Sequence, residues 1–252
     1  MIPKVIHYCW LSDDIYPPKI RLCIDSWKKF LPDYEIILWD IQKFPVNSVR
    51  WVEEAYKNGK YAFAADYIRL YALYHYGGIY LDSDVEVIKS FDDLLALPYF
   101  IGVDSQNKIE AAVIGVEPLN PWISFCLDYY KDRPFVLEGG RLDMKTLPII
   151  MQEIIEKQRK IEIVKKNFLE DNKDSSIVRF FPFDFFCSKR HDTGIIQKTD
   201  RTYAIHHFAM SWCTPKDRFL TYCKRFSVKI LGNKGTSFLI TLLGLYRLKK
   251  KV

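Results

Sequence analysis

Residues 63–87 read FAADYIRLYALYHYGGIYLDSDVEV, and they join an apolar helix to a short strand that ends in acids. The first part is rich in Ala, Leu, Tyr and Ile, which predicts a long buried helix, and the Gly pair after it is typical of a helix C-terminus. The residues IYL then predict a strand, with Asp82 and Asp84 at its carboxyl end. This order predicts a helix that packs on a sheet and acids that stand at the edge of that sheet.

The segments on either side extend this pattern. Upstream, KVIHYCW (4–10) and YEIILW (34–39) predict buried strands, and apolar residues at helical spacing lie between them. Strand, helix and strand within forty residues predict a βαβ opening. Downstream, VEVI, YFIGV, AAVIGV, IVRFFPFDFF and TYAIHHF predict strands, and PWISFCLDYY and LPIIMQEIIEKQRK predict helices. The alternation predicts the α/β class.

Length and composition predict one large domain. The chain has 252 residues, 49% of them hydrophobic and 15% aromatic, which is enough to bury a core. A strand begins almost directly after Met1, so we expect no export signal. Six cysteines stand at least ten residues apart, which excludes CxxC zinc spacing and a compact disulfide framework. We therefore expect free thiols in a reducing cytoplasm.

The positive charge is confined to the end of the chain. Of the overall +6, residues 215–252 carry +9, from ten Lys and Arg against one Asp, which leaves −3 for residues 1–214. This distribution argues against a nucleic-acid-binding function for the whole chain. We expect a domain at residues 1–214 and a basic helical tail at residues 215–252, with the boundary near Thr214 and Pro215.

The acids Asp82 and Asp84 are candidates for a metal site. In open α/β sheets the crevice at the carboxyl ends of the strands is where ligands bind. Clustered carboxylate oxygens suit a hard divalent cation such as Mg²⁺ or Mn²⁺, with coordination positions left for phosphate oxygens. The alternative is a solvated turn, because acids are common in turns.

Asp66 and Arg69 form a charged i, i+3 pair on the apolar helix. Burying them is costly unless they pair with each other or bind something, so a structural ion pair and a ligand clamp are both open. The helix leads through Gly77 and Gly78 directly into the acidic turn. That connection favours a role at the same site.

At this point the residues resemble a known family. Residues 63–87, together with IPKVIHYCWL (2–11) and SWKKFLPDYEIILWD (26–40), resemble the DXD sugar transferases of glycosyltransferase family 32 and, more distantly, the glucosyltransferase domain of the large glucosylating bacterial toxins. The resemblance covers roughly residues 2–95. It implies a GT-A fold, which is a Rossmann-like mixed sheet flanked by helices, a nucleotide-sugar donor, and a divalent metal, Mn²⁺ or Mg²⁺.

The resemblance also implies roles for individual residues. Asp84 falls on the metal ligand of the acidic motif, and Asp82 on the residue that contacts ribose and metal. Asp66 and Arg69 fall on an Asp-x-x-Arg that clamps the transferred sugar and the diphosphate. Trp10 falls on an aromatic residue that stacks on the nucleotide base in the toxins, although a core tryptophan at a strand end is an equal alternative.

The segment YAIHHFAMSW (203–212) offers a third metal ligand. His206 and His207 are adjacent in an extended segment, so they point in opposite directions and only one faces a given site. A lone His on a strand is more often a core or surface residue than a ligand. However, HFAM (207–210) resembles the His-aromatic-x-Gly strand of related transferases, with Met210 where glycine is common, and this departure leaves the choice of histidine open. We choose His207, and expect Ser211 and Trp212 to form a flap over the diphosphate.

The tail suits a membrane surface better than a membrane span. The apolar run SFLITLLGLY has ten residues, well below the ~20 that cross a bilayer. Basic residues on both sides of apolar stretches suit helices that lie in the interface of an anionic membrane. The alternative is a final helix packed on the core with a solvated basic end.

Together these observations predict a metal-dependent hexosyltransferase, and the family resemblance implies that it retains the configuration of the anomeric carbon. We expect a UDP-linked donor, such as UDP-galactose or UDP-glucose, and a lipid-linked surface or capsular polysaccharide precursor as acceptor, at the cytoplasmic, inner face of a bacterial plasma membrane. No nucleic-acid partner is expected. The alternatives are a nucleotide-sugar hydrolase with the same metal site and a membrane-attached glycan-binding module without turnover.

Overall fold

The computed structural model describes residues 1–164, 176–210 and 215–242. The predicted flap at Ser211 and Trp212 lies outside the described residues. The helices and strands are, in chain order, β1 (Val5–Cys9), α1 (Pro18–Phe30), β2 (Glu35–Trp39), α2 (Arg50–Lys57), α3 (Tyr61–Tyr76), β3 (Gly78–Leu81), β4 (Val85–Val87), β5 (Tyr99–Val103), β6 (Ile109–Val116), α4 (Pro121–Asp128), α5 (Leu147–Glu156), β7 (Lys160–Ile163), β8 (Ile177–Phe180), α6 (Phe183–Phe186), β9 (Ala204–His206) and α7 (Pro215–Leu242).

A mixed five-stranded sheet forms the centre, in the order β2-β1-β3-β6-β5. Strand β1 pairs in parallel with β2 and β3, whereas β6 runs antiparallel to β3 and β5. Two small sheets, β4-β9 and β7-β8, flank it. The predicted α/β class, with the mixed sheet and flanking helices of a GT-A fold and a βαβ opening, is confirmed.

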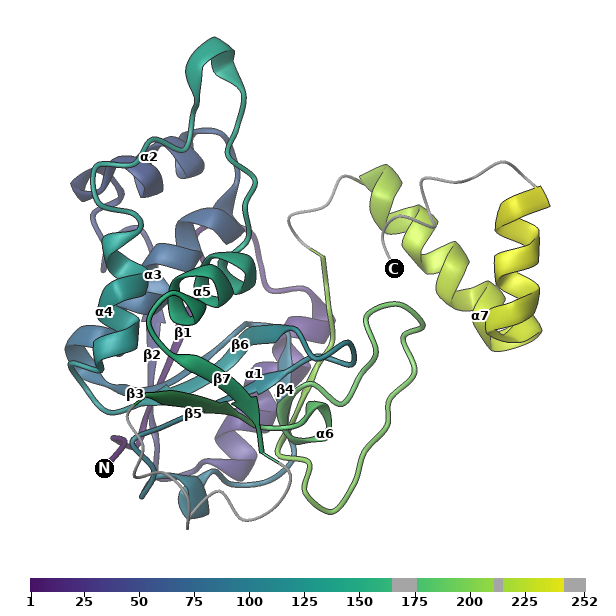
Figure 1. Ribbon diagram of the computed structural model, residues 1–252, viewed down its shortest axis with the longest axis horizontal. Coiled ribbons are helices and arrows are strands. Elements are labelled where there is room, and N and C mark those ends of the chain that lie inside the picture. Colours follow the sequence, from purple (N-terminus) through teal and green to yellow (C-terminus); the bar gives the residue numbers. More distant parts are fainter. Residues whose placement is uncertain (165–175, 211–214, 243–252) are drawn as a thin grey trace.

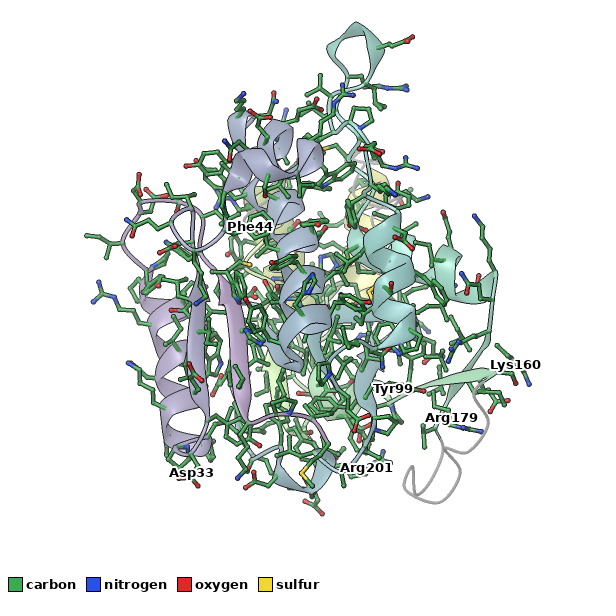
Figure 2. The ribbon with its side chains drawn as sticks, turned by 90° about the vertical axis from the view of Figure 1, so that its left-hand side faces the viewer. Asp33, Phe44, Tyr99, Lys160, Arg179 and Arg201 are labelled. Carbon is green, nitrogen blue, oxygen red and sulfur yellow. The ribbon has the colours of Figure 1, made fainter. Side chains whose placement is uncertain are left out.

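Helices cover both faces of the central sheet. Helix α1 lies on one side of β1 and β2, and α3 lies on the other (Figure 2). Helices α2, α4 and α5 gather around α3 on that second side (Figure 1). The core between these layers is rich in aromatic residues, and Trp27, Trp51 and Trp122 are almost fully buried. The predicted core helix is thus the helix that carries Asp66 and Arg69.

The Gly pair turns the chain from α3 directly into β3. Both residues have positive φ, 64° at Gly77 and 95° at Gly78, a region that side chains disfavour. A Cβ at Gly77 would lie 2.6 Å from Cδ of Pro118, and one at Gly78 would lie 2.7 Å from the carbonyl oxygen of Val5. Because no other residue fits this reversal, the pair fixes where β3 starts and hence where Asp82 leaves the sheet.

Helix α7 is broken at Gly232, which has φ 67°. It stands beside the body of the molecule, clear of the central sheet (Figure 1). In the described part of the chain no helix has the length and apolar character to span a membrane. The predicted boundary near residue 214 remains a prediction. The described cysteines, Cys9, Cys23, Cys126, Cys187 and Cys223, are free thiols, as predicted.

His7 on β1 is a neutral, fully buried hydrogen-bonding group. Its Nδ1 accepts a hydrogen bond from Nε1 of Trp39 at 3.1 Å, so its Nε2 carries the proton and donates to the carbonyl of Gly77 at 2.9 Å. Burial lowers the pKa of His7 to about 4, although the Gly77 carbonyl opposes the shift. His7 therefore joins β1, β2 and the Gly pair only while it is uncharged.

We expect the fold to lose stability as the pH falls from about 7 to about 4, because unfolded His7 takes up a proton near its ordinary pKa of about 6.5 whereas folded His7 does not. The shift corresponds to about 3 kcal/mol. The free energy of unfolding, measured with urea at several pH values for the wild type and His7→Asn, tests this. The two curves should converge toward low pH; parallel curves would contradict a neutral buried His7.

Candidate active site

The acidic turn is held from two sides. Asp82 follows β3, and its N–H donates to the carbonyl of Ala112 on β6 at 2.9 Å. Its own carbonyl accepts from the N–H of Val85 at 2.9 Å, which closes a tight turn. The carbonyl of Asp84 accepts from the N–H of His207 at 3.0 Å. The backbone thus places both carboxylates between the central sheet and β9.

The structure brings His206 to the acids, not His207. Strands β4 and β9 pair antiparallel with Val85 opposite His206, and Nε2 of His206 lies 3.3 Å from Oδ1 of Asp84. Ligand atoms of Asp82, Asp84 and His206 lie within 4.8 Å of one another. The ring of His207 points away and lies 2.7 Å from Glu86. His206 therefore replaces His207 as the candidate metal ligand.

These three side chains fit a divalent cation. They offer carboxylate oxygens and one imidazole nitrogen, a donor set that suits Mn²⁺, and suits Mg²⁺ less because of the nitrogen. One oxygen of Asp82 is engaged by Arg69, and Oδ2 of Asp84 accepts from the N–H of Ala209 at 2.6 Å. The remaining lone pairs converge on one space, so the site could hold a metal ion with positions left for a ligand.

Arg69 ties the carboxylates together. It is 6% exposed, and its Nη2 lies 2.7 Å from Oδ1 of Asp82 and 3.5 Å from Oδ1 of Asp66. Its Nη1 donates to the carbonyl of Ala111, and its guanidinium lies 4.3 Å from the centre of the Tyr80 ring. Its Nε has no hydrogen-bond partner among the described residues. Arg69 and Asp66 thus form a buried ion pair, and the contact of Arg69 with Asp82 places this pair at the candidate site.

The two acids beside Arg69 are hard to ionise. Burial raises the pKa of Asp66 to about 7, against the opposing charge of Arg69. Burial also raises the pKa of Asp82, and the charges of Arg69 and His206 oppose that shift. A carboxyl that is close to half protonated at neutral pH both donates and accepts hydrogen bonds, which suits Asp66 to sugar hydroxyl groups.

His206 lies between two buried carboxylates. Burial disfavours its charged form, but Asp84 and Glu110 raise the pKa of His206 well above its usual range. In turn, burial works against ionisation of Asp84, and the charge and hydrogen bond of His206 outweigh it and lower the pKa of Asp84 to about 2. Without a metal ion, the imidazolium offsets part of the charge of these two acids. A bound cation would take over that charge.

Glu110 is a site residue that sequence reasoning missed. Its Oε1 lies 3.4 Å from Nδ1 of His206, and its Oε2 lies 3.5 Å from Sγ of Cys187. A carboxylate at Nδ1 orients the ring so that Nε2 faces the metal, which is how metal-binding histidines are usually supported. The available signal was one acid in the otherwise apolar strand β6, which has the sequence IEAAVIGV.

The loop after β9 adopts an unusual backbone. Phe208 and Met210 have φ of 53° and 54°, in the left-handed region that residues other than glycine rarely occupy. Met210 stands where the family resemblance has glycine, and its positive φ gives the reason why glycine is common there. The same loop presents the N–H of Ala209 to Asp84, so its strained shape serves the site.

Trp10 leaves the sheet at the same edge as the acids. Strand β1 runs parallel to β3 with His7 beside Tyr80, so Trp10 follows β1 near the level of Asp82. The ring is half-buried, packs edge-on against Tyr16 with 4.8 Å between the ring centres, and donates to the carbonyl of Asp14. This position suits base stacking as well as packing, so the predicted role stays open.

Two clefts lie away from the acidic residues. One of about 620 Å³ lies beside Phe44 (Figure 2) and is lined by aromatic residues of α3. The other, of about 320 Å³, adjoins it and includes Tyr130. Neither lining includes Asp66, Asp82, Asp84 or His206. We place the chemistry at the acidic residues, because the lining of the first cleft has no acid and that of the second has only Asp128 and Asp132, which belong to no group of three possible metal ligands among the described residues.

Sequence comparisons find a family and several curated relatives. Residues 17–101 match the family described as "Glycosyltransferase sugar-binding region containing DXD motif". The chain is 31% identical over 176 residues to mannosyl phosphorylinositol ceramide synthase SUR1 of Saccharomyces cerevisiae, which covers 66% of this chain and 45% of that protein. It is 33% identical over 129 residues to inositol phosphoceramide mannosyltransferase 3 of Schizosaccharomyces pombe, which covers 48% of this chain and 35% of that protein. The chain thus spans less than half the length of these relatives.

A comparison with solved structures finds the PaToxG glycosyltransferase. The match has a TM-score of 0.46 and 24% sequence identity, and it covers 62% of this chain and 68% of that one.

We expect His206→Ala to weaken Mn²⁺ binding by more than about tenfold, because loss of a ligand should cost at least as much as loss of a residue that only supports one. His207→Ala is the matched control and should bind Mn²⁺ like the wild type, since its ring contacts Glu86. Calorimetric titration of both variants with Mn²⁺ gives the comparison. If only His207→Ala lost Mn²⁺ binding, His207 would be the metal ligand, as the sequence analysis predicted.

Proposed function

We propose, on the premise that residues 17–101 are a glycosyltransferase sugar-binding region with a DXD motif, that the protein is a metal-dependent glycosyltransferase. It transfers a hexose from a nucleotide-sugar to a hydroxyl group of an acceptor. The observation that supports this most directly is the convergence of Asp82, Asp84 and His206 at the carboxyl edge of the sheet. The same residues also fit a nucleotide-sugar hydrolase. The two reactions differ in whether an acceptor hydroxyl group or water receives the sugar.

The residues divide the work as follows. Asp82, Asp84 and His206 would hold the cation. When bound, a divalent cation stabilises the charge that develops on the diphosphate. Arg69 keeps Asp82 in place, and Asp66 is placed to bind hydroxyl groups of the transferred sugar. The buried surroundings strengthen these interactions because water is excluded.

The transfer breaks the bond between the anomeric carbon and the β-phosphate oxygen, and the electron pair stays on that oxygen. The acceptor oxygen bonds to the same face of the anomeric carbon, so configuration is retained. The acceptor proton passes to the departing phosphate oxygen, and the products are the glycoside and the nucleoside diphosphate. We assign no covalent nucleophile to this reaction.

The acceptor is proposed to be a membrane lipid. The two relatives are named for mannosyl transfer to inositol phosphoceramide, a phosphate-bearing lipid. Both names contain a lipid acceptor, and the sequence-based expectation was also a lipid-linked acceptor. Neither name mentions a capsular glycan. The proposed donor remains UDP-linked, with a mannosyl donor as the competing choice.

The protein is proposed to work at the surface of a membrane, the inner face of a bacterial plasma membrane in the sequence-based expectation. Helix α7 exposes Phe219, Tyr222, Phe226 and Ile230, and the same helix carries Lys216, Arg218, Lys224, Lys229 and Lys234. Apolar side chains that enter the interface and lysines on anionic head groups are the two elements of interfacial binding. Each basic residue near the surface contributes about 1 kcal/mol at low salt.

We expect Asp84→Asn to lower metal-dependent turnover of the nucleotide-sugar by about a hundredfold or more, because a preorganised charge at the diphosphate is removed. Asp33→Asn is the control, since Asp33 (labelled in Figure 2) precedes β2 and so lies near the amino ends of β1 and β2, at the opposite end of these strands from the acids. Release of nucleoside diphosphate, followed with and without a chelator across a panel of nucleotide-sugars, measures this. Full activity of Asp84→Asn, or in excess chelator, would exclude the metal site. Free sugar as the main product with acceptor lipid present would favour hydrolysis.

We expect deletion of residues 215–252 to abolish flotation with vesicles that contain anionic lipid, because the apolar face of α7 and the +9 charge are both removed. Raising the salt concentration should also reduce flotation of the full chain, because salt screens its attraction to anionic lipid. An unchanged distribution of the truncated chain would refute membrane binding through the tail.

A further inference from the structure

Lys189 and Arg225 are two partly or fully buried cations whose described hydrogen-bond acceptors are carbonyl groups. Nζ of Lys189 donates to the carbonyl of His207 at 2.8 Å. Nε and Nη2 of Arg225, which is 7% exposed, donate to the carbonyl of His191 at 3.3 and 2.9 Å. A carbonyl dipole offsets only part of a buried positive charge. These cations therefore favour an anion beside them.

The neighbouring carboxylates already have other partners. Asp192 forms two hydrogen bonds with Arg190, at 3.0 and 2.7 Å. Glu86 lies 2.7 Å from the ring of His207 and 4.0 Å from Nζ of Lys19. Burial lowers the pKa of Lys189 to about 8, and the positive charges of Arg225, Lys19 and Lys229 add to the shift, whereas Asp84 opposes it. Three cations and one carboxylate thus act on Lys189, so the excess charge around it is positive.

Both cations adjoin the candidate active site. The N–H of His207, whose carbonyl binds Lys189, donates to the carbonyl of Asp84. The ring of His191, whose carbonyl binds Arg225, packs on Phe208 with 5.0 Å between ring centres, and Phe208 packs on His206 at 4.1 Å. A ligand on these cations would therefore lie within a few side chains of the metal ligands. Arg69, by contrast, reaches the site from α3.

The same helix that supplies Arg225 exposes an apolar face. The side chains of Phe219, Tyr222, Phe226 and Ile230 are three or four residues apart and are 54–66% exposed. At about 100° per residue, Lys229 lies on the helix between Arg225 and this stripe. A phosphate at the cations would thus continue, along one helix, into a surface that suits acyl chains.

We propose that Lys189 and Arg225, with Lys19 and Lys229 at the rim, bind the phosphate group of a lipid acceptor whose acyl chains contact the exposed face of α7. This inference rests on the proposed glycosyltransferase function. The ligand is a phospholipid rather than the diphosphate of the donor, because the stripe requires an apolar group on the same molecule. The donor diphosphate has the cation site instead.

The test is calorimetric titration of the full chain with dihexanoyl phosphatidic acid and, separately, with inorganic phosphate, both in saturating Mn²⁺ and UDP. We expect the lipid to bind more tightly than inorganic phosphate. Lys189→Met should weaken binding of both by more than about tenfold, as expected for the loss of a desolvated charge partner. Phe226→Ser should weaken binding of the lipid alone. Lys234→Met, an exposed lysine beyond the break in α7, is the matched control and should change neither.

A second variant covers the case in which Lys189→Met does not fold: the exposed Lys229→Met should weaken lipid binding by about fivefold, in line with about 1 kcal/mol per basic residue. Competition between UDP and the lipid, equal effects of Lys234→Met and Lys229→Met, or no lipid binding would each overturn the inference. Separate titrations of the wild type with Mn²⁺ and UDP, with and without the lipid, distinguish the two proposals. If binding of Mn²⁺ and UDP is present while lipid binding is absent, only this inference fails; if it is absent, the proposed function fails.

Discussion

The site depends on the balance of buried charge around Asp82 and Asp84. Carboxylates that approach one another inside a protein repel and lose solvation, so they persist there only if cations and hydrogen bonds compensate them. Arg69 provides one cation and His206 provides the other. Each cation also contacts a second acid: Arg69 contacts Asp66, and His206 contacts Glu110. Four carboxyl groups thus share two cations, and the excess of acid favours a divalent cation at the site.

The backbone brings these charges together by joining two distant parts of the chain. Helix α3 carries Arg69, the Gly pair reverses the chain, and β3 delivers Asp82 to the same place. Strand β9 then returns from the last part of the domain and pairs with β4, which sets His206 beside Asp84. The left-handed residues after β9 add the N–H of Ala209. The site at the sheet edge is therefore built mainly by two segments, residues 66–84 and residues 206–209.

Local patterns predicted the parts of the site that are close in sequence. The apolar helix, the Gly stop and the acids after a strand are each encoded within residues 63–87, so α3, β3 and the acidic turn agree with the prediction. His206 could not be chosen over His207 because the choice depends on the register of β9 against β4, strands that are far apart in the chain. Glu110 was missed because one acid in an apolar strand shows no partner until β6 and β9 are placed together. The docking of Arg225 against His191 likewise depends on tertiary contacts.

The most direct measurement is anomalous scattering from crystals of the full chain soaked with Mn²⁺ and UDP. We expect one strong manganese peak within coordination distance of the carboxylate oxygens of Asp82 and Asp84 and of Nε2 of His206, with Nδ1 of His206 still facing Glu110. A peak elsewhere, or no peak while His206 keeps its contact with Asp84, would contradict a metal site built on this charge balance.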